Sequence, residues 1–357
     1  CIALIKEARD QEKDVLIYGS GENAELASHA NVDWTKFANV KTIEAGIPTV
    51  TAYGNDYDQQ TELKEFLIHR GFSKGNALVG IHFGDTDKTL NEAFRYCSSV
   101  GGINILITNN KEQISPDANA LLFIDTDDTE LAADIAQTFT HYIAVSLGSH
   151  HILPSHAWNS SYKEYSYFLC KALDNEKLSE QYLQYVGDVI HGALILNKNV
   201  YSVGNGGSAA MAAYFTQSLQ SIYRNLPGSL RKIVNLSFFN HVITESLKRG
   251  TYKQDIYSTI ISRLGIVDGD ILLGISTSGN STNIIHPFNT FSGLQKIAIL
   301  GFGDGGVLGA SAEVDFSIIV PDEFNHRSYA IAEDGQRMIL TSILKHLKSK
   351  IERTDAN

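Results

Sequence analysis

Short apolar runs ending in glycine or serine turns recur along the chain, separated by segments whose apolar residues recur every three or four positions. Runs of the first kind are typical of buried parallel strands, and the second spacing is typical of helices. The expected strand-to-turn segments are 15–21, 75–81, 103–108, 120–124, 200–206, 269–275, 296–301 and 315–320. The expected helices include 63–69, 90–100, 162–173, 178–196, 209–219, 256–264 and 338–347. This alternation predicts α/β architecture, with doubly wound parallel sheets covered by helices on both faces.

The strand-to-turn segments occur in two sets with the same order. Segment 15–21 resembles 200–206, and segment 75–81 resembles 269–275. The offset is about 190 residues throughout, as expected for a duplicated unit rather than for two α/β domains that merely look alike. The sequence therefore predicts a first copy at 1–148, a connector at 149–161 and a second copy at 162–357. The histidines of the connector, His150, His151 and His156, are interpreted as a solvated linker or, alternatively, as metal ligands.

Two loops of the second copy have the composition of a phosphate cradle. The first, at 204–208, reads Gly-Asn-Gly-Gly-Ser, and the second, at 276–281, reads Ser-Thr-Ser-Gly-Asn-Ser. Each follows an expected strand and precedes a helix, where backbone N–H groups and hydroxyls can bind an anion. Either loop alone could be an ordinary turn. Together they predict these phosphosugar-binding residues: Asn205, Gly206, Ser208, Ser276, Thr277, Ser278 and Ser281.

Composition narrows the function classes. The formal net charge of −11 argues against nonspecific nucleic-acid binding, which requires a basic face. No apolar run is long enough to suggest a membrane span, so no membrane partner is expected. Cys1, Cys97 and Cys170 are too widely spaced for a disulfide framework or a zinc knuckle, which favours a cytoplasmic location. Because the chain begins at Cys1, its natural start is expected upstream.

The two loops, taken with the strand 269–275, closely resemble the phosphoheptose isomerase branch of the sugar isomerase (SIS) family. The resemblance covers nearly the whole second copy, including the 301–306 turn and Gln336. It implies two tandem SIS domains, each a flavodoxin-like parallel sheet between helices, and a homodimer or higher homo-oligomer. It also implies conversion of an aldose phosphate to a ketose phosphate, with sedoheptulose 7-phosphate as the first candidate substrate. Family members use a glutamate and a histidine for proton transfer, with a second histidine and a glutamine nearby, sometimes around zinc.

The second copy departs from the family pattern at its catalytic positions. Tyr214 and Ser218 stand where the family has a histidine and a glutamate, and Leu344 stands at the catalytic histidine. Only Gln336 matches, and it is predicted to bind substrate. The second copy by itself is therefore expected to lack the proton-transfer groups.

The first copy shows the opposite pattern. Its second loop contains Asp85 and Asp87, whose carboxylates would repel phosphate. The alignment nevertheless places His29 and Asp33, four residues apart on one helix face, on the family histidine and glutamate. His141 falls on the catalytic histidine, whereas Ala133 replaces the glutamine.

A Gly-Asn-Asp segment at 54–56 matches a substrate-contact turn of the family, so Asp56 is predicted to bind substrate. Simple turn chemistry explains the same segment equally well.

These patterns predict one composite isomerase site, which draws its phosphate cradle from the second copy and its acid–base groups from the first, within a chain or between subunits. His141, Asp33 and His29 are the predicted catalytic residues and also the candidate zinc ligands. The alternative is a non-catalytic phosphosugar-binding protein of the family with a regulatory or assembly role. The degenerate catalytic positions of the second copy favour that alternative.

Overall fold

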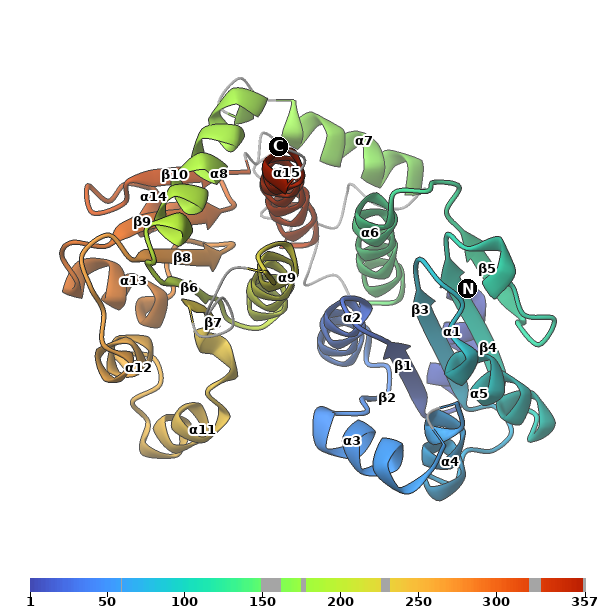
Figure 1. Ribbon diagram of the computed structural model, residues 1–357. Helices are drawn as coiled ribbons and strands as arrows, with labels where there is room; N and C mark the ends of the chain where they lie inside the picture. Colours follow the sequence, from blue (N-terminus) through green and yellow to red (C-terminus); the bar gives the residue numbers. More distant parts are fainter. Residues whose placement is uncertain (59, 149–161, 175–177, 226–231, 321–328, 356–357) are drawn as a thin grey trace. The chain divides into compact units, whose positions relative to one another are not determined.

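The computed structural model describes residues 1–355 apart from 59, 149–161, 175–177, 226–231 and 321–328 (Figure 1). The chain divides into two compact units, Cys1–Ile152 and Leu153–Asn357. The expected connector at 149–161 lies outside the described residues. Each unit has its own parallel sheet and is described by itself.

The first unit contains a five-stranded parallel sheet with the order β2-β1-β3-β4-β5. This is the flavodoxin-like order, with the topological switch between β1 and β3. Its strands are β1 (Val15–Gly19), β2 (Thr42–Ile43), β3 (Ala77–His82), β4 (Ile103–Thr108) and β5 (Ala120–Phe123). Its helices are α1 (Ile2–Asp10), α2 (Asn23–Ala38), α3 (Ile47–Asp56), α4 (Glu62–His69), α5 (Lys88–Ser99), the 3-10 turn η1 (Lys111–Gln113) and α6 (Thr129–Leu147).

The second unit repeats this topology with the order β7-β6-β8-β9-β10. Its strands are β6 (Val200–Val203), β7 (Ile233–Asn235), β8 (Ile271–Ser276), β9 (Gln295–Leu300) and β10 (Phe316–Ile319). Its helical segments before β8 are α7 (Tyr162–Leu173), α8 (Glu180–Ile195), α9 (Gly207–Ile222), η3 (Leu236–Phe238), α11 (Asn240–Arg249) and α12 (Ile256–Leu264). Those after β8 are α13 (Thr282–Thr290), α14 (Gly306–Gly309) and α15 (Tyr329–Asp355).

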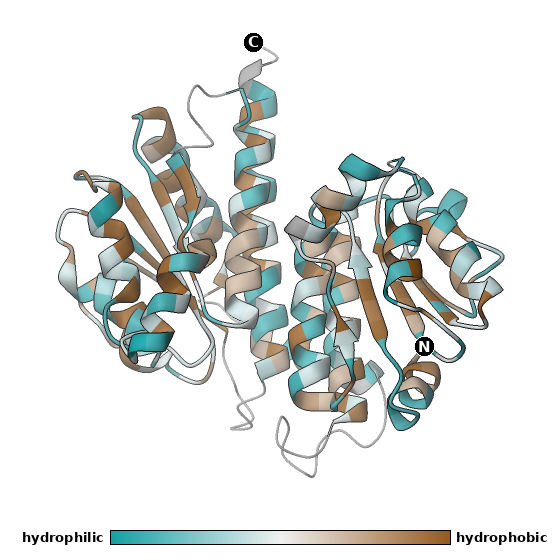
Figure 2. Cartoon of the chain, turned by 90° about the horizontal axis from the view of Figure 1, so that it is seen from below, coloured by the Kyte–Doolittle hydropathy of each residue, from teal (hydrophilic) through white to brown (hydrophobic). Residues whose placement is uncertain are grey.

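Both sheets are buried on their two faces, which explains why their strands are nearly continuous apolar runs. Alternate residues of β1, β3 and β4 pack against α2 and α6 on one face and against α4 and α5 on the other. In the second unit α8, α9 and α15 cover one face, and α12 and α13 cover the other. Figure 2 shows the strands of both units as mostly hydrophobic. The predicted duplication of an α/β sheet is confirmed.

The structure changes two details of the sequence-based expectations. The predicted turn at 54–56 instead ends α3, because the Tyr57 N–H bonds to the Tyr53 carbonyl at 2.9 Å and closes a helical turn. The helix expected at 338–347 is the middle of α15, which runs over Tyr329–Asp355. Among the described residues, no helix has the length and apolar character needed to cross a membrane.

Candidate functional site

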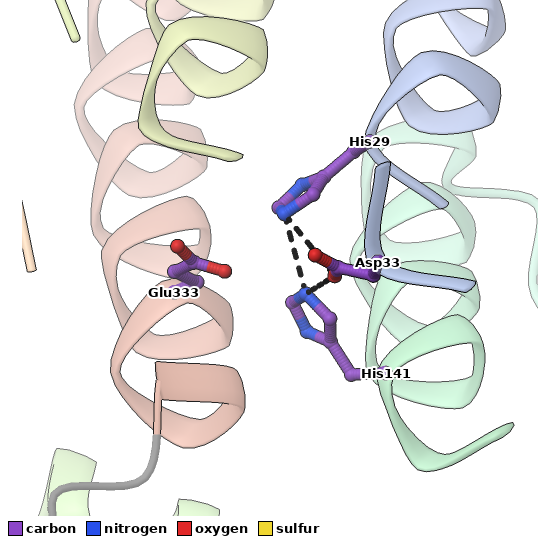
Figure 3. A group of neighbouring side chains, drawn as sticks. All are labelled: His29, Asp33, His141 and Glu333. Atoms are coloured by element: carbon purple, nitrogen blue, oxygen red, sulfur yellow. Dashed lines mark hydrogen bonds and ion pairs between the residues drawn. The ribbon is translucent and has the colours of Figure 1, made fainter. Parts of the chain in front are cut away.

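The first unit brings His29, Asp33 and His141 together between α2 and α6 (Figure 3). His29 and Asp33 lie one helical turn apart on α2, and His141 comes from α6, more than a hundred residues later. Glu333, drawn in the same figure, lies on α15 and is described with the second unit. The first three residues are the predicted acid–base residues of the first copy.

Packing and one hydrogen bond set the register of the two helices that carry this cluster. Trp34, which follows Asp33, is fully buried, and its indole N–H donates to the Thr140 carbonyl at 3.0 Å. Thr140 immediately precedes His141. The α6 helix begins at an Asp128 cap, whose carboxylate accepts the Leu131 N–H at 2.9 Å. These contacts hold both sides of the cluster in place, as a preorganised site requires.

The three side chains meet through their polar atoms. Asp33 Oδ2 lies 3.0 Å from His141 Nε2 and 3.6 Å from His29 Nε2, and the two Nε2 atoms are 3.4 Å apart. All three residues are at least 94% buried, with 2, 6 and 2% of their surface exposed in chain order. Burial alone raises the pKa of the Asp33 carboxyl, but His29 and His141 outweigh it and hold that pKa below its usual value. Asp33 is therefore an ionised partner that orients both imidazole rings.

The lowered pKa of Asp33 predicts a pH dependence of stability. Because the folded-state pKa lies below the unfolded one, the carboxylate stabilises the fold above the unfolded value of about 3.9. That contribution is lost as pH falls through the folded pKa. With EDTA present, Asp33→Asn should lower the melting temperature near pH 7 more than near pH 3. An equal loss at both pH values would contradict the assigned charge.

The loop after β3 of the first unit, at 82–87, corresponds to the serine-rich loop of the second unit, and its side chains bond to one another and to Ser20. The Ser20 hydroxyl donates to Asp87 Oδ2 at 3.1 Å, and His82 Nδ1 lies 3.8 Å from the same oxygen. The other carboxylate oxygen of Asp87 caps α5 by accepting the Leu90 N–H at 3.1 Å. This loop thus presents a carboxylate where the second unit presents hydroxyls.

The second unit retains the serine-rich loop between β8 and α13. Ser276 Oγ accepts the Gly279 N–H and Ser278 Oγ accepts the Asn280 N–H, both at 3.2 Å. Ser281 is the N-cap residue of α13, and its side chain makes no capping hydrogen bond. Hydroxyls beside the first N–H groups of a helix can bind an anion, so binding of phosphate by this loop stays a prediction.

The other loop of the second unit, at 204–208, is held by a network of side-chain hydrogen bonds. Asn205 Oδ1 accepts from Tyr252 at 2.7 Å, from Asn283 at 3.0 Å and from Tyr257 at 3.2 Å. The Tyr257 hydroxyl also lies 3.1 Å from the Gly204 carbonyl, and burial raises its pKa, so it stays a donor. Asn205 therefore positions the loop backbone, and direct substrate contact by its side chain stays a prediction.

Removing the Tyr257 hydroxyl should loosen this loop. Tyr257→Phe leaves buried acceptors short of a donor, so we expect about 1–3 kcal/mol lower stability and weaker binding of inorganic phosphate. Chemical denaturation and calorimetry measure the two effects. Tyr185→Phe, at a side chain 57% exposed, is the matched control. Unchanged phosphate affinity in Tyr257→Phe would show that the network does not shape the loop.

Sequence reasoning missed Glu333, three residues before Gln336 on α15. The Thr277 hydroxyl lies 3.5 Å from Glu333 Oε1 and 3.4 Å from Gln336 Oε1, so both residues border the serine-rich loop. Gln336 is fully buried and donates to the Ile299 carbonyl at 3.1 Å, and its contact with substrate stays a prediction. The spacing of three could have indicated that a carboxylate shares this helix face with Gln336.

Three further positions singled out from the sequence are Tyr214, Leu344 and Asp56, and the structure surrounds each of them with ordinary packing or surface contacts. Tyr214 donates to or accepts from Thr341 at 3.0 Å, the Arg337 guanidinium lies 3.9 Å from its ring centroid, and Leu344 belongs to the core. In the first unit Asp56 is exposed at the end of α3 and accepts the Asn55 side-chain N–H at 3.0 Å. The structure does not place Asp56 in the His29–Asp33–His141 cluster.

Comparison with known proteins identifies the family. The family described as "SIS domain" matches residues 162–301. The phosphoheptose isomerase of Colwellia psychrerythraea is 33% identical over 142 residues, which cover 39% of this chain and 70% of that protein. The chain belongs to the SIS domain family. The phosphoheptose isomerase of Proteus mirabilis is 36% identical over 122 residues, or 33% of this chain and 60% of that protein.

Solved structures extend the likeness of fold to the first unit. The C-terminal domain of glucosamine-fructose-6-phosphate aminotransferase from Francisella tularensis has a TM-score of 0.58 at 14% identity, covering 97% of this chain and 87% of its own. A structure titled putative tagatose-6-phosphate ketose/aldose isomerase, from Clostridium novyi, has a TM-score of 0.55 at 11% identity. The match covers 98% of this chain and 85% of that chain. SIS-fold structures thus cover nearly the whole chain, and both units share that fold.

Proposed function

We propose that this protein is an isomerase that interconverts an aldose phosphate and a ketose phosphate, with sedoheptulose 7-phosphate as the first candidate substrate. The relatives named phosphoheptose isomerase and the intact serine-rich loop support a phosphosugar substrate. The main support for a catalytic role is the buried cluster of His29, Asp33 and His141. A purely phosphosugar-binding protein has no need of two histidines fixed around one buried carboxylate.

The proposed chemistry is proton transfer between two neighbouring carbons. One group removes a proton from one carbon and returns it to the neighbouring carbon, while another group transfers a proton between the two adjacent oxygens. His141 takes the role of acid or base, because its Nε2 carries the shortest contact to the ionised Asp33. His29 transfers the second proton, and Asp33 fixes the orientation of both rings. Hydroxyls and N–H groups of Ser208, Ser276, Ser278 and Ser281 hold the phosphate.

The same three residues suit a zinc ion. Two imidazole nitrogens and a carboxylate oxygen are the donor set of many catalytic zinc sites. Donors bound tetrahedrally at ordinary zinc distances lie roughly 3.3–3.5 Å apart, close to the 3.0–3.6 Å separations found here. A bound zinc would polarise the sugar carbonyl as a Lewis acid. His29, Asp33 and His141 would then be its protein ligands.

We further propose that the two units contribute to one reaction, within a chain or between subunits of a homo-oligomer. The support is chemical complementarity. The first unit keeps acid–base groups but fills its own loop with Asp87, whereas the second keeps the serine-rich loop but has Tyr214 and Leu344 at the acid–base positions.

An isomerisation assay with sedoheptulose 7-phosphate tests this function. The wild type should form the corresponding aldose phosphate, and activity should fall after EDTA treatment and return with zinc if the metal takes part. Ser276→Ala should weaken phosphosugar binding, whereas Ser99→Ala, on α5 of the first unit, should not. Binding that depends on Ser276 without turnover of aldose or ketose phosphates would favour the regulatory or assembly role. Failure to bind any phosphosugar would reject both functions.

A further inference from the structure

Phe302 adopts a backbone conformation that bulky residues avoid. Its φ is 54°, in the left-handed region, and the glycines around it have similar angles, 59° at Gly303 and 79° at Gly305. Glycine is the residue expected at every such position, because a side chain there costs free energy. A phenylalanine in this turn points to a role for its ring that glycine cannot fill.

The strained turn lies directly against the serine-rich loop. The Gly301 N–H donates to the Thr277 carbonyl at 3.1 Å, and the Leu308 N–H donates to the Gly279 carbonyl at 3.1 Å. The Val307 N–H donates to Asn280 Oδ1 at 3.0 Å. Phe302 is therefore anchored at the carboxyl edge of the sheet, where ligands of open α/β sheets bind.

The Phe302 ring packs edge-to-face on Tyr329, with ring centroids 4.8 Å apart. Tyr329 begins α15 and is 45% exposed. Glu333 and Gln336 follow it at spacings of four and seven, so all three share one helix face. The two polar residues border Thr277, and the aromatic pair continues the same wall one helical turn further on. Small-molecule sites commonly combine a few such polar groups with apolar or aromatic side chains.

We infer that Phe302, backed by Tyr329, contacts the carbon chain of the bound phosphosugar and sets the chain length that the protein prefers. The inference rests on the proposed function, because it requires the phosphate to lie on the serine-rich loop. In this contact the apolar C–H surface of the sugar packs against the half-buried Phe302 ring. Glu333 and the serine-rich loop would bind the hydroxyls on the other side of the sugar's carbon chain.

Phe302→Gly separates this role from a structural one, since glycine suits the left-handed turn. Calorimetry should compare inorganic phosphate, erythrose 4-phosphate, ribose 5-phosphate and sedoheptulose 7-phosphate. We expect phosphate affinity to change by less than about twofold, and affinity for the preferred phosphosugar to fall about tenfold. The preference among the three sugars should flatten. Tyr329→Ala should act in the same direction, and Val307→Ala, at an exposed side chain of the same segment, should leave all affinities unchanged.

The outcomes distinguish this inference from the function on which it rests. If the wild type binds phosphosugars with a length preference that Phe302→Gly and Tyr329→Ala both retain, the aromatic wall has no such role and the proposed function stands. If phosphate affinity falls as much as sugar affinity, Phe302 merely shapes the loop. If the wild type binds neither phosphate nor any phosphosugar, both proposals fail.

Discussion

Gly279→Ala should abolish phosphate binding, with an expected loss of roughly 100-fold or more in affinity. Gly279 has a φ of 62°, and a Cβ built there would lie 1.7 Å from the Gly305 carbonyl oxygen. That oxygen belongs to backbone, so relief requires the serine-rich loop and the 301–306 turn to separate. Since the N–H of Gly279 also bonds to Ser276 Oγ, separation would disperse the hydroxyls of the proposed cradle. Calorimetry with inorganic phosphate measures the loss.

Gly303→Ala is the matched control. Gly303 lies in the adjacent turn with a φ of 59°, but nothing lies within 4 Å of a Cβ built there. This variant carries only the left-handed backbone cost, about 1–2 kcal/mol, and its phosphate affinity should stay close to that of the wild type. An equal loss of phosphate affinity in the two variants would mean that the close approach of Gly279 to Gly305 does not matter for binding. Retained binding in Gly279→Ala would place the phosphate elsewhere.

The duplicated fold could be predicted from sequence because the same local signals occur twice. Buried parallel strands need continuous apolar runs, and several runs here end in turns rich in glycine or serine. Two short edge strands, Thr42–Ile43 and Ile233–Asn235, carry no such signal and became visible only in the structure. Strands of two or three residues gain their pairing from neighbours that are distant in sequence, and no local pattern predicts that.

The site was predictable only in part. His29, Asp33 and His141 were all assigned by resemblance to a family, and the spacing of four indicated only that His29 and Asp33 share a helix face. The structure supplied the physical link, through the packing of α2 on α6 and the Trp34–Thr140 hydrogen bond. The support that Tyr252 gives Asn205 and the contact of Glu333 with Thr277 were not predictable, because both depend on hydrogen-bond partners from separate segments.

His141→Ala should lower kcat of the proposed isomerase by roughly 10²–10⁴-fold, the usual contribution of a positioned acid or base. The 3.0 Å contact between its Nε2 and Asp33 Oδ2 makes His141 the imidazole best placed for that role. His69→Ala, which removes an exposed histidine from α4 of the same unit, is the control and should retain activity. Phosphate affinity should be unchanged in both variants, because the serine-rich loop belongs to the second unit.

Three measurements separate loss of chemistry from loss of fold. His141→Ala leaves the Asp33 carboxylate without one partner, so a stability loss of about 1–3 kcal/mol is expected, and circular dichroism should still show a folded protein. Added imidazole should restore part of the activity if the missing group is an acid or base. If His141 is a metal ligand, zinc content should fall in His141→Ala and stay unchanged in His69→Ala. Full activity in folded His141→Ala would remove His141 from the mechanism and leave His29 as the histidine to test.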